Sequence, residues 1–465
     1  MVKIKFGTDG WRAIIADEYS VENVRRVTAG AAQWMQQNNM GKVVIGHDCR
    51  FGGEMFLKAA TEVFASYGIH VYYAIDFVST PMVSLGVVKL KADLGIVITA
   101  SHNPPSYNGY KLKSSYGGPS IPADIAAVES LIPDEYIPGN VVPFDELASA
   151  GKIENIDLET MYVRHAEEHF DLAAIKNSGM KIGYDAMYGA GQRAMLRLLP
   201  DVIHLHCDYN PSFKGQAPEP IGKNLTEFSD MIRSRGDIAL GIANDGDADR
   251  IGLFDSKGEF VDSHHILLLL LYYLHQVKGM DGEVVVTFSV TDKMKNLAEK
   301  YGLKYEVTKI GFKYIAEIMT HRDVLVGGEE SGGLAVKGHI PERDGIWMGL
   351  VIAEFMAKTG KTLDQLIQEI YNLVGSFYFD RDDLHITEAK KQEIIAVCKN
   401  TPYTHFQDLN VESLETLDGF KFILGDSRWV MIRPSGTEPV LRVYAQGKDK
   451  ADTRSILDKV KQTIL

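Results

Sequence analysis

Cysteine is scarce in this chain, and its spacing gives no sign of a disulfide framework or a zinc site. The 465 residues include only Cys49, Cys207 and Cys398, an odd number of cysteines that lie far apart. Closely spaced or paired cysteines are typical of structural zinc sites and of small secreted domains. The sequence therefore predicts a protein of a reducing compartment, the cytoplasm.

Long hydrophobic runs are also missing. The longest, Ile266 to Leu274, is far shorter than the ~20 residues that a membrane-spanning helix needs. The residues that follow Met1 contain no apolar stretch that could act as a signal sequence. We therefore expect no contact with a membrane.

No basic block occurs, and acidic residues outnumber basic ones. The chain has 62 Asp and Glu against 49 Lys and Arg, a formal net charge of −13. A field of this sign repels nucleic acid, so we expect small molecules as partners, and any phosphate group must be attracted by local cations. A hydrophobic share of 45% is too high for a disordered chain.

The length predicts several domains, because one domain usually takes ~100–200 residues. Short β-branched runs alternate with longer helical patterns, which favours α/β domains with parallel or mixed sheets. The last part changes to a helix, several strands and a closing helix, an α+β pattern. We predict three α/β domains and a C-terminal α+β domain with boundaries at 1–150, 151–255, 256–375 and 376–465.

Several elements can be predicted from hydrophobic periodicity. Helices are expected at 54–67, after 157, at 264–276, at 293–301 and from 450. Strands are expected at 42–46, 70–74, 94–99, 181–184, 238–243, 251–254, 283–287, 324–326, 420–424, 429–432 and 441–445. Residues 132–144 have the composition of a loop.

The stretch Thr99-Ala-Ser-His-Asn-Pro-Pro105 places the hydroxyl of Ser101 directly after a predicted strand. Ligands of α/β sheets bind beyond the carboxyl ends of strands, so the position suits chemistry. When such a tetrapeptide stands alone, a simple Ser/Asn turn before a proline is the favoured interpretation. No G-x-S-x-G motif surrounds Ser101, which argues against an acyl-transfer serine.

The stretch Asp245-Gly-Asp-Ala-Asp-Arg250 carries three carboxylates at alternate positions after a predicted strand. Hard cations such as Mg²⁺ prefer oxygen ligands, and so dense a negative cluster needs a cation to offset its repulsion. An EF-hand is excluded, because Arg250 and Ser256 stand where its glycine and closing glutamate would be. A solvated acidic turn and an aspartyl-phosphate phosphatase remain as alternatives.

Two further loops carry groups that suit a sugar phosphate. The stretch Gly327-Gly-Glu-Glu-Ser-Gly-Gly333 offers Glu329 and Ser331 on a flexible backbone, and carboxylates accept hydrogen bonds from sugar hydroxyls. The stretch Arg433-Pro-Ser-Gly-Thr-Glu-Pro439, with Arg442 nearby, combines forked cations with hydroxyls, as phosphate sites do. Each loop alone is also compatible with an ordinary surface turn.

Taken in this order, together with Phe6-Gly-Thr-Asp-Gly-Trp-Arg12, these loops resemble those of the α-D-phosphohexomutase superfamily, which includes phosphoglucomutase and phosphomannomutase. The resemblance spans nearly the whole chain. It implies four domains around a central cleft, phosphorylation of Ser101 and one Mg²⁺ held by Ser101, Asp245, Asp247 and Asp249. It further implies catalytic roles for Ser101, His102, Lys111 and Arg12, and a substrate-binding set of Arg250, Lys309, Gly311, Glu329, Ser331, Arg343, Arg433, Ser435, Gly436, Thr437 and Arg442.

The activity that the resemblance implies is the interconversion of hexose 1-phosphate and hexose 6-phosphate, with glucose 1,6-bisphosphate as intermediate and activator. Gly333 stands where dual-specificity phosphomannomutases and phosphoglucosamine mutases of bacteria usually have a histidine. The glutamate pair and His339-Ile-Pro-Glu-Arg-Asp-Gly345 instead resemble phosphoglucomutase. We therefore expect glucose as the preferred sugar and mannose as the second.

Alternative functions are a phosphoglucosamine mutase, a metal-dependent sugar phosphatase and a sugar-phosphate sensor without turnover. A phosphatase would need only the acidic loop and would release inorganic phosphate. A sensor would not need Ser101, the acidic loop and Lys111 together. Both a monomer and a homodimer fit the sequence.

Overall fold

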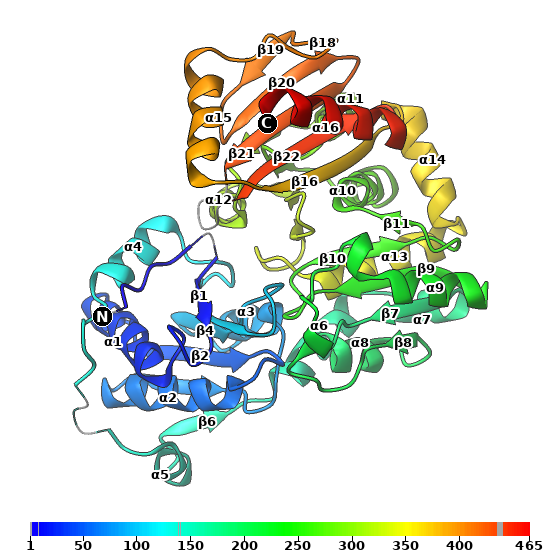
Figure 1. Ribbon diagram of the computed structural model, residues 1–465. Coiled ribbons are helices and arrows are strands. Elements are labelled where there is room, and N and C mark those ends of the chain that lie inside the picture. Colours follow the sequence, from blue (N-terminus) through cyan, green and yellow to red (C-terminus); the bar gives the residue numbers. More distant parts are fainter. Residues whose placement is uncertain (1, 8, 138, 140, 435–439) are drawn as a thin grey trace. The chain divides into compact units, whose positions relative to one another are not determined.

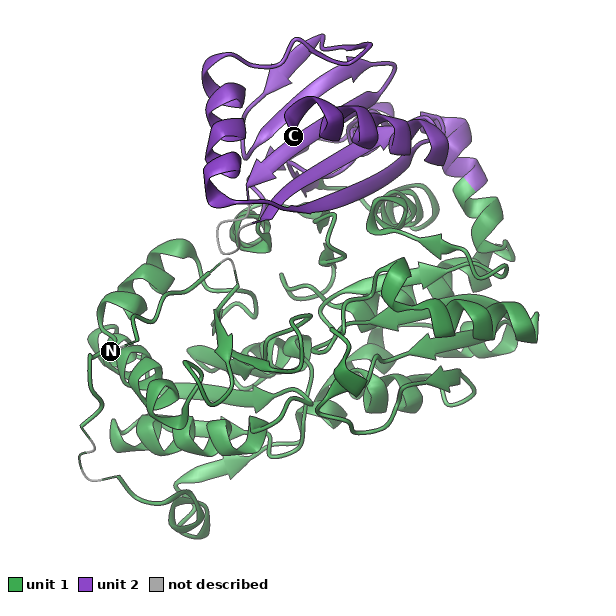
Figure 2. Cartoon of the chain, in the orientation of Figure 1, with its two compact units in different colours: residues 1–283, 311–367 green, residues 284–310, 368–465 purple. Residues whose placement is uncertain are grey.

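The computed structural model describes residues 2–465 apart from residues 8, 138, 140 and 435–439 (Figure 1). The chain divides into two compact units (Figure 2). Unit 1 comprises residues 1–283 and 311–367, and unit 2 comprises residues 284–310 and 368–465. One boundary between the units falls inside helix α14 (Leu363–Val374).

The first sheet of unit 1 has six strands in the order β1-β5-β4-β2-β3-β6. The middle strands β2 and β4 are buried on both faces, which explains their continuous apolar sequences. All strands of this sheet run in the same direction except β5, which is antiparallel to its neighbours β1 and β4. Their bounds are β1 Trp11–Ile14, β2 Lys42–His47, β3 His70–Tyr73, β4 Leu94–Ile98, β5 Tyr107–Ser114 and β6 Ile153–Asn155. The helices are α1 Val21–Gln37, α2 Gly53–Ser66, α3 Thr80–Lys89, α4 Pro122–Ser130 and α5 Phe144–Ser149.

The second sheet of unit 1 has five strands in the order β11-β10-β9-β7-β8. Strands β9 and β10 are antiparallel, and the turn between them carries residues 245–250. The strands are β7 Lys181–Asp185, β8 Ile203–Leu205, β9 Ile238–Asn244, β10 Ile251–Phe254 and β11 Phe260–Val261. The α-helices are α6 Leu158–His169, α7 Leu172–Asn177, α8 Gln192–Leu198 and α9 Thr226–Arg235, and the short 3₁₀ helices are η1 Phe213–Gly215 and η2 Gly222–Asn224.

The rest of unit 1 contains an antiparallel pair of strands, β14 (Val324–Gly328) and β15 (Leu334–Val336), joined by a turn. The helices of this region are α10 Ser263–Leu271, the π-helix η3 Tyr272–Val277, α12 Phe312–Met319 and α13 Gly345–Thr359. Asp344 is the N-cap of helix α13, because its carboxylate accepts a hydrogen bond from the Trp347 backbone N–H at 2.9 Å.

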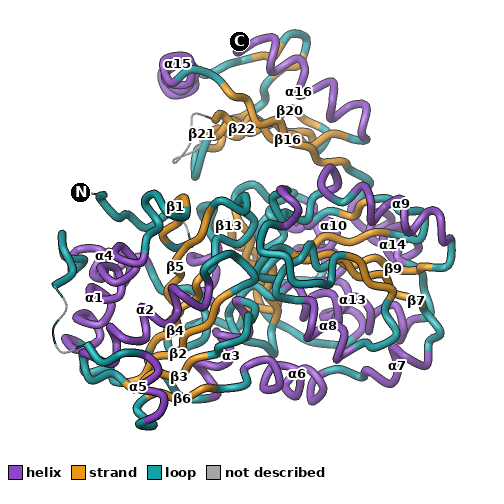
Figure 3. Tube along the Cα trace, turned by 60° about the horizontal axis from the view of Figure 1, so that its bottom comes forward, coloured by secondary structure: helices purple, strands orange, loops and turns teal. Residues whose placement is uncertain are grey.

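Unit 2 contains a five-stranded antiparallel sheet in the order β16-β22-β21-β20-β19. Helices α15 and α16 lie beside this sheet (Figure 3) and form one core with it. The elements are β16 Tyr378–His385, α15 Glu388–Asn400, β17 His405–Phe406, β18 Leu409–Asn410, β19 Ser413–Glu415, β20 Phe420–Gly425, β21 Arg428–Pro434, β22 Val440–Gly447 and α16 Lys450–Ile464. Unit 2 also holds the parallel strands β12 (Glu283–Thr287, from its second residue) and β13 (Tyr305–Thr308), with α11 (Lys293–Lys300) between them.

The predicted elements are present, with end positions shifted by a few residues. The helix expected at 264–276 consists of α10 followed by a π-helical segment. Residues 107–111 had no predicted element, but they belong to the eight-residue strand β5, so Lys111 lies on a strand. Among the described residues, no helix has both the length and the apolar character needed to cross a membrane.

Candidate active site

Ser101 lies three residues beyond the end of β4, in a backbone conformation that is uncommon for a side-chain-bearing residue, with φ +51°. Its hydroxyl donates a hydrogen bond of 2.6 Å to Oδ2 of Asp245 and lies 3.4 Å from Nδ1 of His102. Burial, together with Arg250 and Arg12, lowers the pKa of His102 well below its usual value, so the imidazole is neutral. The buried nucleophile candidate is thus connected directly to the acidic loop.

A buried arginine holds the Ser101 loop in place. The guanidinium of Arg50 donates hydrogen bonds to the carbonyl oxygens of Ser101 (2.6 Å), Asn103 (2.7 Å), Pro104 (2.9 Å) and Tyr107 (3.0 Å). Arg50 was not predicted as a site residue. One signal could have found it, because Arg50 lies three residues beyond the carboxyl end of β2, where ligand-binding loops of such sheets occur.

The carboxylate of Asp48 completes this support. It lies 3.3 Å from Nε of Arg50, and it accepts a 2.5 Å hydrogen bond from the Thr99 hydroxyl. That hydroxyl in turn accepts a hydrogen bond from the Ser101 backbone N–H at 2.9 Å. The loop conformation is therefore fixed by charged, buried partners rather than by the prolines alone.

The three carboxylates of the acidic loop are fully buried and close enough together to share one cation. Asp245 Oδ1 accepts the backbone N–H of Arg250 at 3.0 Å, and Asp247 Oδ2 accepts the Thr80 hydroxyl. Oδ1 of Asp247 and Oδ1 of Asp249 are buried and have no hydrogen-bond partner among the described residues. Unsatisfied buried carboxylate oxygens are costly, and hard oxygen donors suit Mg²⁺, so these residues fit a metal.

The pKa of Asp245 also indicates that the triad fits a metal ion. Burial, and then the neighbouring Asp247 and Asp249, raise the pKa of Asp245 well above its usual value. Three carboxylates at one place therefore resist full ionisation without a cation. The buried triad is consistent with a metal site.

Lys111 partly neutralises the triad. Its Nζ lies 2.8 Å from Asp247, 2.8 Å from Asp249 and 2.9 Å from Asp9. Burial lowers the pKa of Lys111, but these carboxylates outweigh burial and raise the pKa above its usual value, so the side chain is charged. Asp9 was not predicted as a site residue, although it belongs to the N-terminal segment that carries the family resemblance.

Two arginines reach the same region from other elements. Arg343 forms ion pairs with Asp249 at 2.8 Å and with Asp9. Arg12, on β1, donates a hydrogen bond of 2.7 Å to the side chain of Asn103 beside Ser101. Unit 1 therefore brings together Ser101, Lys111, Arg12, Arg343 and the acidic loop, which are far apart in the sequence.

The turn between β14 and β15 holds Glu329 and Ser331 and is joined to the acidic loop. Arg250 and Gly333 form an isolated antiparallel bridge, and the Ile251 backbone N–H donates to Gly332 at 3.1 Å. Burial raises the pKa of Glu329 to about 7, although Arg343 opposes the rise. A side chain at position 333 would collide with the aliphatic stem of Arg343, which explains the glycine there.

Unit 2 carries the predicted phosphate-binding arginines. Arg433 and Arg442 are directly opposite each other on β21 and β22. Like charges at opposed positions repel, and each arginine has a carboxylate nearby that offsets this repulsion, Asp418 for Arg433 and Asp383 at 3.8 Å from Arg442 Nε. Arg433 Nε lies 3.3 Å from Asp418, and the same carboxylate accepts the backbone N–H of Ile310, next to the exposed Lys309, at 2.8 Å. Gly311, also predicted, lies across the boundary in unit 1. Ser435, Gly436 and Thr437 lie outside the described residues.

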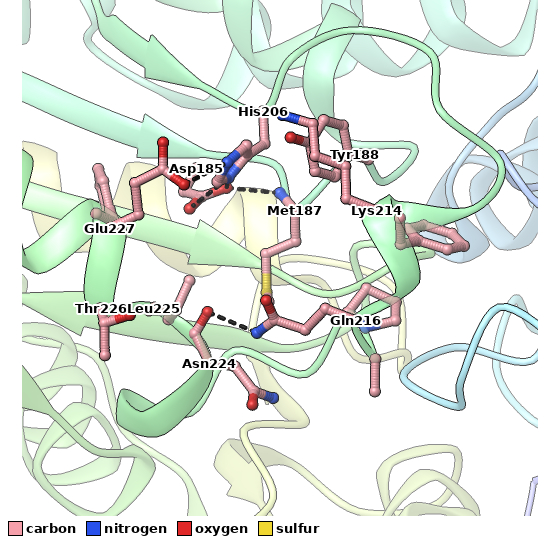
Figure 4. Close-up of a pocket in the computed structure, with 14 residues that line it drawn as sticks. Asp185, Met187, Tyr188, His206, Lys214, Gln216, Asn224, Leu225, Thr226 and Glu227 are labelled. Carbon is pink, nitrogen blue, oxygen red and sulfur yellow. Dashed lines mark hydrogen bonds and ion pairs between the residues drawn. The ribbon is translucent and has the colours of Figure 1, made fainter.

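A small cavity of about 140 Å³, lined by both polar and apolar side chains, lies in unit 1 beside β7 (Figure 4). His206 lies 3.0 Å from Asp185 and 3.3 Å from Glu227 on its wall. The wall residues Met187 and Tyr188 lead into Ala190, whose backbone N–H donates to Gly246 of the acidic loop at 2.9 Å. None of the predicted site residues lines the cavity.

Comparison with known proteins gives a consistent result over almost the full chain. Four domain models match, described as phosphoglucomutase/phosphomannomutase α/β/α domain I (residues 3–136), domain II (160–258), domain III (262–374) and the C-terminal domain (386–463). A phosphoglucomutase/phosphomannomutase of Thermococcus kodakarensis is 28% identical over 97% of this chain and 96% of its own length. A phosphoglucosamine mutase of Methanococcus maripaludis is 31% identical over 96% and 95%.

A crystal structure from Thermus thermophilus, provisionally named a phosphomannomutase, superimposes with a TM-score of 0.88. It is 32% identical, and the match covers 100% of this chain and 99% of the other. Together with the four matching domains, these findings define the class as a phosphohexomutase, an isomerase that shifts a phosphoryl group within a sugar phosphate.

The chain belongs to the phosphoglucomutase/phosphomannomutase family of the α-D-phosphohexomutase superfamily. Its architecture is that of the family, with three domains of mixed α/β sheets and a C-terminal domain of antiparallel sheet. The sequence-based predictions of family, fold class and enzyme class are confirmed. The predicted boundaries of the four domains remain a prediction.

Proposed function

We propose that this phosphohexomutase interconverts hexose 1-phosphate and hexose 6-phosphate through a phosphorylated Ser101. The observation that carries the proposal is the 2.6 Å hydrogen bond from Ser101 to Asp245, made in a cluster where Lys111 bridges the other two aspartates. A hydroxyl that is buried beside a metal-binding triad and an ammonium group has what a phosphoryl acceptor needs.

In this scheme the free hydroxyl oxygen of a sugar monophosphate forms a bond to the phosphorus of phosphorylated Ser101 as the bond to the Ser101 oxygen breaks, and the proton of the hydroxyl passes to the Ser101 oxygen. The product is a 1,6-bisphosphate, glucose 1,6-bisphosphate when the sugar is glucose. The sugar then turns over, and its other phosphoryl group returns to the Ser101 oxygen, which leaves the isomeric monophosphate. The same enzyme form is regenerated, so no net hydrolysis occurs.

We assign Asp245, Asp247 and Asp249 to one Mg²⁺, with the phosphate on Ser101 as a further ligand. The bound ion would neutralise charge on the transferring phosphoryl oxygens. Lys111, which is charged, would donate to the reacting hydroxyl oxygen, and Arg12 and the neutral His102 would lie beside it. Arg343 and Arg250 would hold the substrate near the triad.

The remaining predicted residues would bind the two ends of the substrate. We assign the sugar hydroxyls to Glu329 and Ser331, on the turn that is joined to the acidic loop. The distal phosphate would contact the paired arginines of unit 2, Arg433 and Arg442, with Lys309, Gly311, Ser435, Gly436 and Thr437 as further predicted contacts. Either end of the sugar would occupy this phosphate site in turn.

Glucose phosphate is our proposed main substrate and mannose phosphate the second. Glu329 and Ser331 would contact hydroxyls that both sugars share, so discrimination at the 2-position has to come from elsewhere. A site that is not built around the differing group supplies ~1–3 kcal/mol, or roughly tenfold to two-hundredfold. Assays of catalytic efficiency with glucose, mannose, glucosamine and N-acetylglucosamine 1-phosphates test this order directly.

A phosphoglucosamine mutase is the second candidate. The name of the Methanococcus maripaludis relative, at 31% identity, favours it. The arrangement of Gly333 against Arg343 favours glucose, because it leaves no place for the histidine that such enzymes usually carry there. If glucosamine 1-phosphate has the highest catalytic efficiency of the four sugars, the glucose assignment is wrong and this candidate replaces it.

The phosphoserine assignment has its own test. We expect Ser101→Ala to lose nearly all turnover but to keep its affinity for glucose 1-phosphate, because the other binding groups remain. Intact mass spectrometry should find a phosphorylated fraction in the parent protein and none in the variant. Undiminished turnover in the variant would refute the role of Ser101.

A further inference from the structure

A second cluster of metal-binding side chains lies on helix α6, apart from the acidic triad. His165, Glu168 and His169 occur at positions i, i+3 and i+4, which places them on one face of the helix. One donor atom of each side chain lies within 4.8 Å of the others. We propose that these three residues form a separate binding site for a late transition-metal ion such as Zn²⁺.

The two imidazoles are already close and oriented. The ring centroids of His165 and His169 are 4.2 Å apart. Nδ1 of His169 is 2.7 Å from the carbonyl oxygen of His165, and a hydrogen bond there leaves Nε2 as the nitrogen that can bind a metal. A hydrogen bond from one ring nitrogen to a backbone carbonyl is the usual way in which a metal-binding histidine is oriented.

His165 gives the second, independent observation. Its side chain is buried, with 9% of the residue exposed, and its Nδ1 has no hydrogen-bond partner among the described residues. A buried ring nitrogen without a hydrogen-bond partner has lost its water of hydration without gaining another partner. A metal ion bound to the ring of His165 would provide such a partner.

The surroundings of His165 limit its movement. Its ring stacks on Trp347 at 5.3 Å and on His339 at 5.5 Å between centroids. His339 is in turn held by its Nε2, which lies at hydrogen-bond distance, 2.9 Å, from Oδ2 of Asp344, the N-cap of α13. Glu168 and His169 are exposed, so an ion can enter from solvent and meet two oriented imidazoles and one adjustable carboxylate.

The chemistry of the donors separates this site from the triad. Two imidazoles and one carboxylate favour Zn²⁺ and its neighbours, whereas three carboxylates favour Mg²⁺. The combination of two histidines and a glutamate is a known zinc ligand set, and its remaining coordination position would be filled by water. Both sites can therefore be filled at once by different ions.

The test is a Zn²⁺ titration of the full-length protein by calorimetry, with saturating Mg²⁺ present to occupy the triad. We expect one Zn²⁺ per chain at the α6 site. His169→Gln and Glu168→Gln should each weaken this binding at least about tenfold, because each removes one of three protein ligands. Both residues are exposed, so both variants should keep the fold and the Mg²⁺-dependent activity.

Two other variants in unit 1 are matched controls for His169→Gln and Glu168→Gln. His204→Gln removes another exposed histidine, and Glu167→Gln changes the carboxylate next to Glu168 on a different face of α6, so both should bind Zn²⁺ like the parent. Asp247→Asn should also keep this binding. The proposal is overturned if His169→Gln binds Zn²⁺ as tightly as the parent, if Asp247→Asn abolishes the binding, or if no Zn²⁺ binds while Mg²⁺ is present.

Discussion

Arg50 shows how one side chain can set the geometry of a catalytic loop. Its guanidinium is buried, with 1% of the residue exposed, and it donates to four backbone carbonyls around Ser101 while it pairs with Asp48. Backbone carbonyls carry no net charge, so Asp48 is the group that balances the buried cation. The planar guanidinium, with its five N–H donors, can bind all four carbonyl oxygens and Asp48 at once, and the ammonium group of a lysine cannot.

We therefore expect Arg50→Lys to reduce kcat by about 100-fold, the loss that a small displacement of a reacting group can cause. The free energy of unfolding should fall by roughly 2 to 5 kcal/mol, because buried carbonyls lose their donors. Steady-state kinetics and urea unfolding measure both effects. Arg25→Lys, at a half-exposed pair with Glu62, is the control and should change stability by less than about 1 kcal/mol. Wild-type kcat in Arg50→Lys would contradict the role of the fork.

Glu329 should make stability depend on pH. Its pKa is raised by burial from 4.5 to about 7 in the folded protein. Between these two values the unfolded chain has lost the proton while the folded protein retains it, so stability falls as pH rises through this window and stays lower above it. The measurement is the urea midpoint at pH 5 and at pH 8.

Glu329→Gln cannot ionise, so we expect it to lose less stability than the parent between pH 5 and pH 8. The exposed Glu18→Gln is the matched control and should follow the parent. If Glu329→Gln and the parent show the same change in urea midpoint, the carboxyl of Glu329 titrates normally.

At the scale of elements, two turns are built as one structure. The acidic turn between β9 and β10 and the turn between β14 and β15 meet at the bridge of Arg250 with Gly333. The backbone N–H of Gly345, at the start of α13, donates to Ala248 of the acidic turn at 3.0 Å. The groups proposed for metal binding and for sugar binding are thus fixed to each other by main-chain contacts.

Gly333 provides a test of this coupling. We expect Gly333→Ala to lower kcat/KM roughly tenfold to a hundredfold, because the new methyl group displaces Arg343 from Asp9 and Asp249. Gly41→Ala is the control, since a methyl group there meets no other atom within 4 Å. Unchanged kinetics in Gly333→Ala would mean that Arg343 does not need its present position.

The candidate site could be predicted from the sequence where its residues lie in short local motifs. Ser101, the three aspartates and Glu329 each follow a strand, and the pattern of residues around each one was sufficient to propose it as a site residue. Arg50 could not be predicted in its role, because its carbonyl partners lie 51 to 57 residues further along the chain. Contacts of that kind depend on how strands are ordered in the sheet.

Strand β5 illustrates the same limit for the fold. Its sequence, Tyr107-Asn-Gly-Tyr-Lys-Leu-Lys-Ser114, has little β-branched character, and its lysines are buried. Lys111 and Lys113 are tolerated there because carboxylates face them, Asp247 and Asp249 for the first and Glu342 for the second. Tertiary ion pairs therefore override the local preference, and periodicity cannot reveal them.

At the scale of the whole molecule, the charge distribution is uneven. The net charge is −13, yet the candidate site gathers buried cations, including Arg50, Lys111, Lys113 and Arg343. A net negative protein repels sugar phosphates at long range, but these local cations attract them at short range. The proposed groups are also divided between the units, with the nucleophile and metal ligands in unit 1 and the opposed arginines in unit 2.

Because the proposed phosphate-binding arginines lie in unit 2, a change in unit 2 should affect the binding of both the 1-phosphate and the 6-phosphate. We expect Arg433→Ala to raise KM for glucose 1-phosphate and for glucose 6-phosphate by similar factors with a smaller change in kcat, because either phosphate would occupy the arginine pair in turn. Removing a charge-assisted phosphate contact costs ~1.5–3 kcal/mol, which corresponds to roughly tenfold or more in KM.

Arg428→Ala is a matched control, since Arg428 lies on the same strand but an odd number of residues away and so faces the other side of the sheet. Coupled assays in both directions measure the two KM values. An increase confined to one substrate would contradict the turning of the sugar between its two phosphorylated ends, and so would an equal effect of Arg428→Ala.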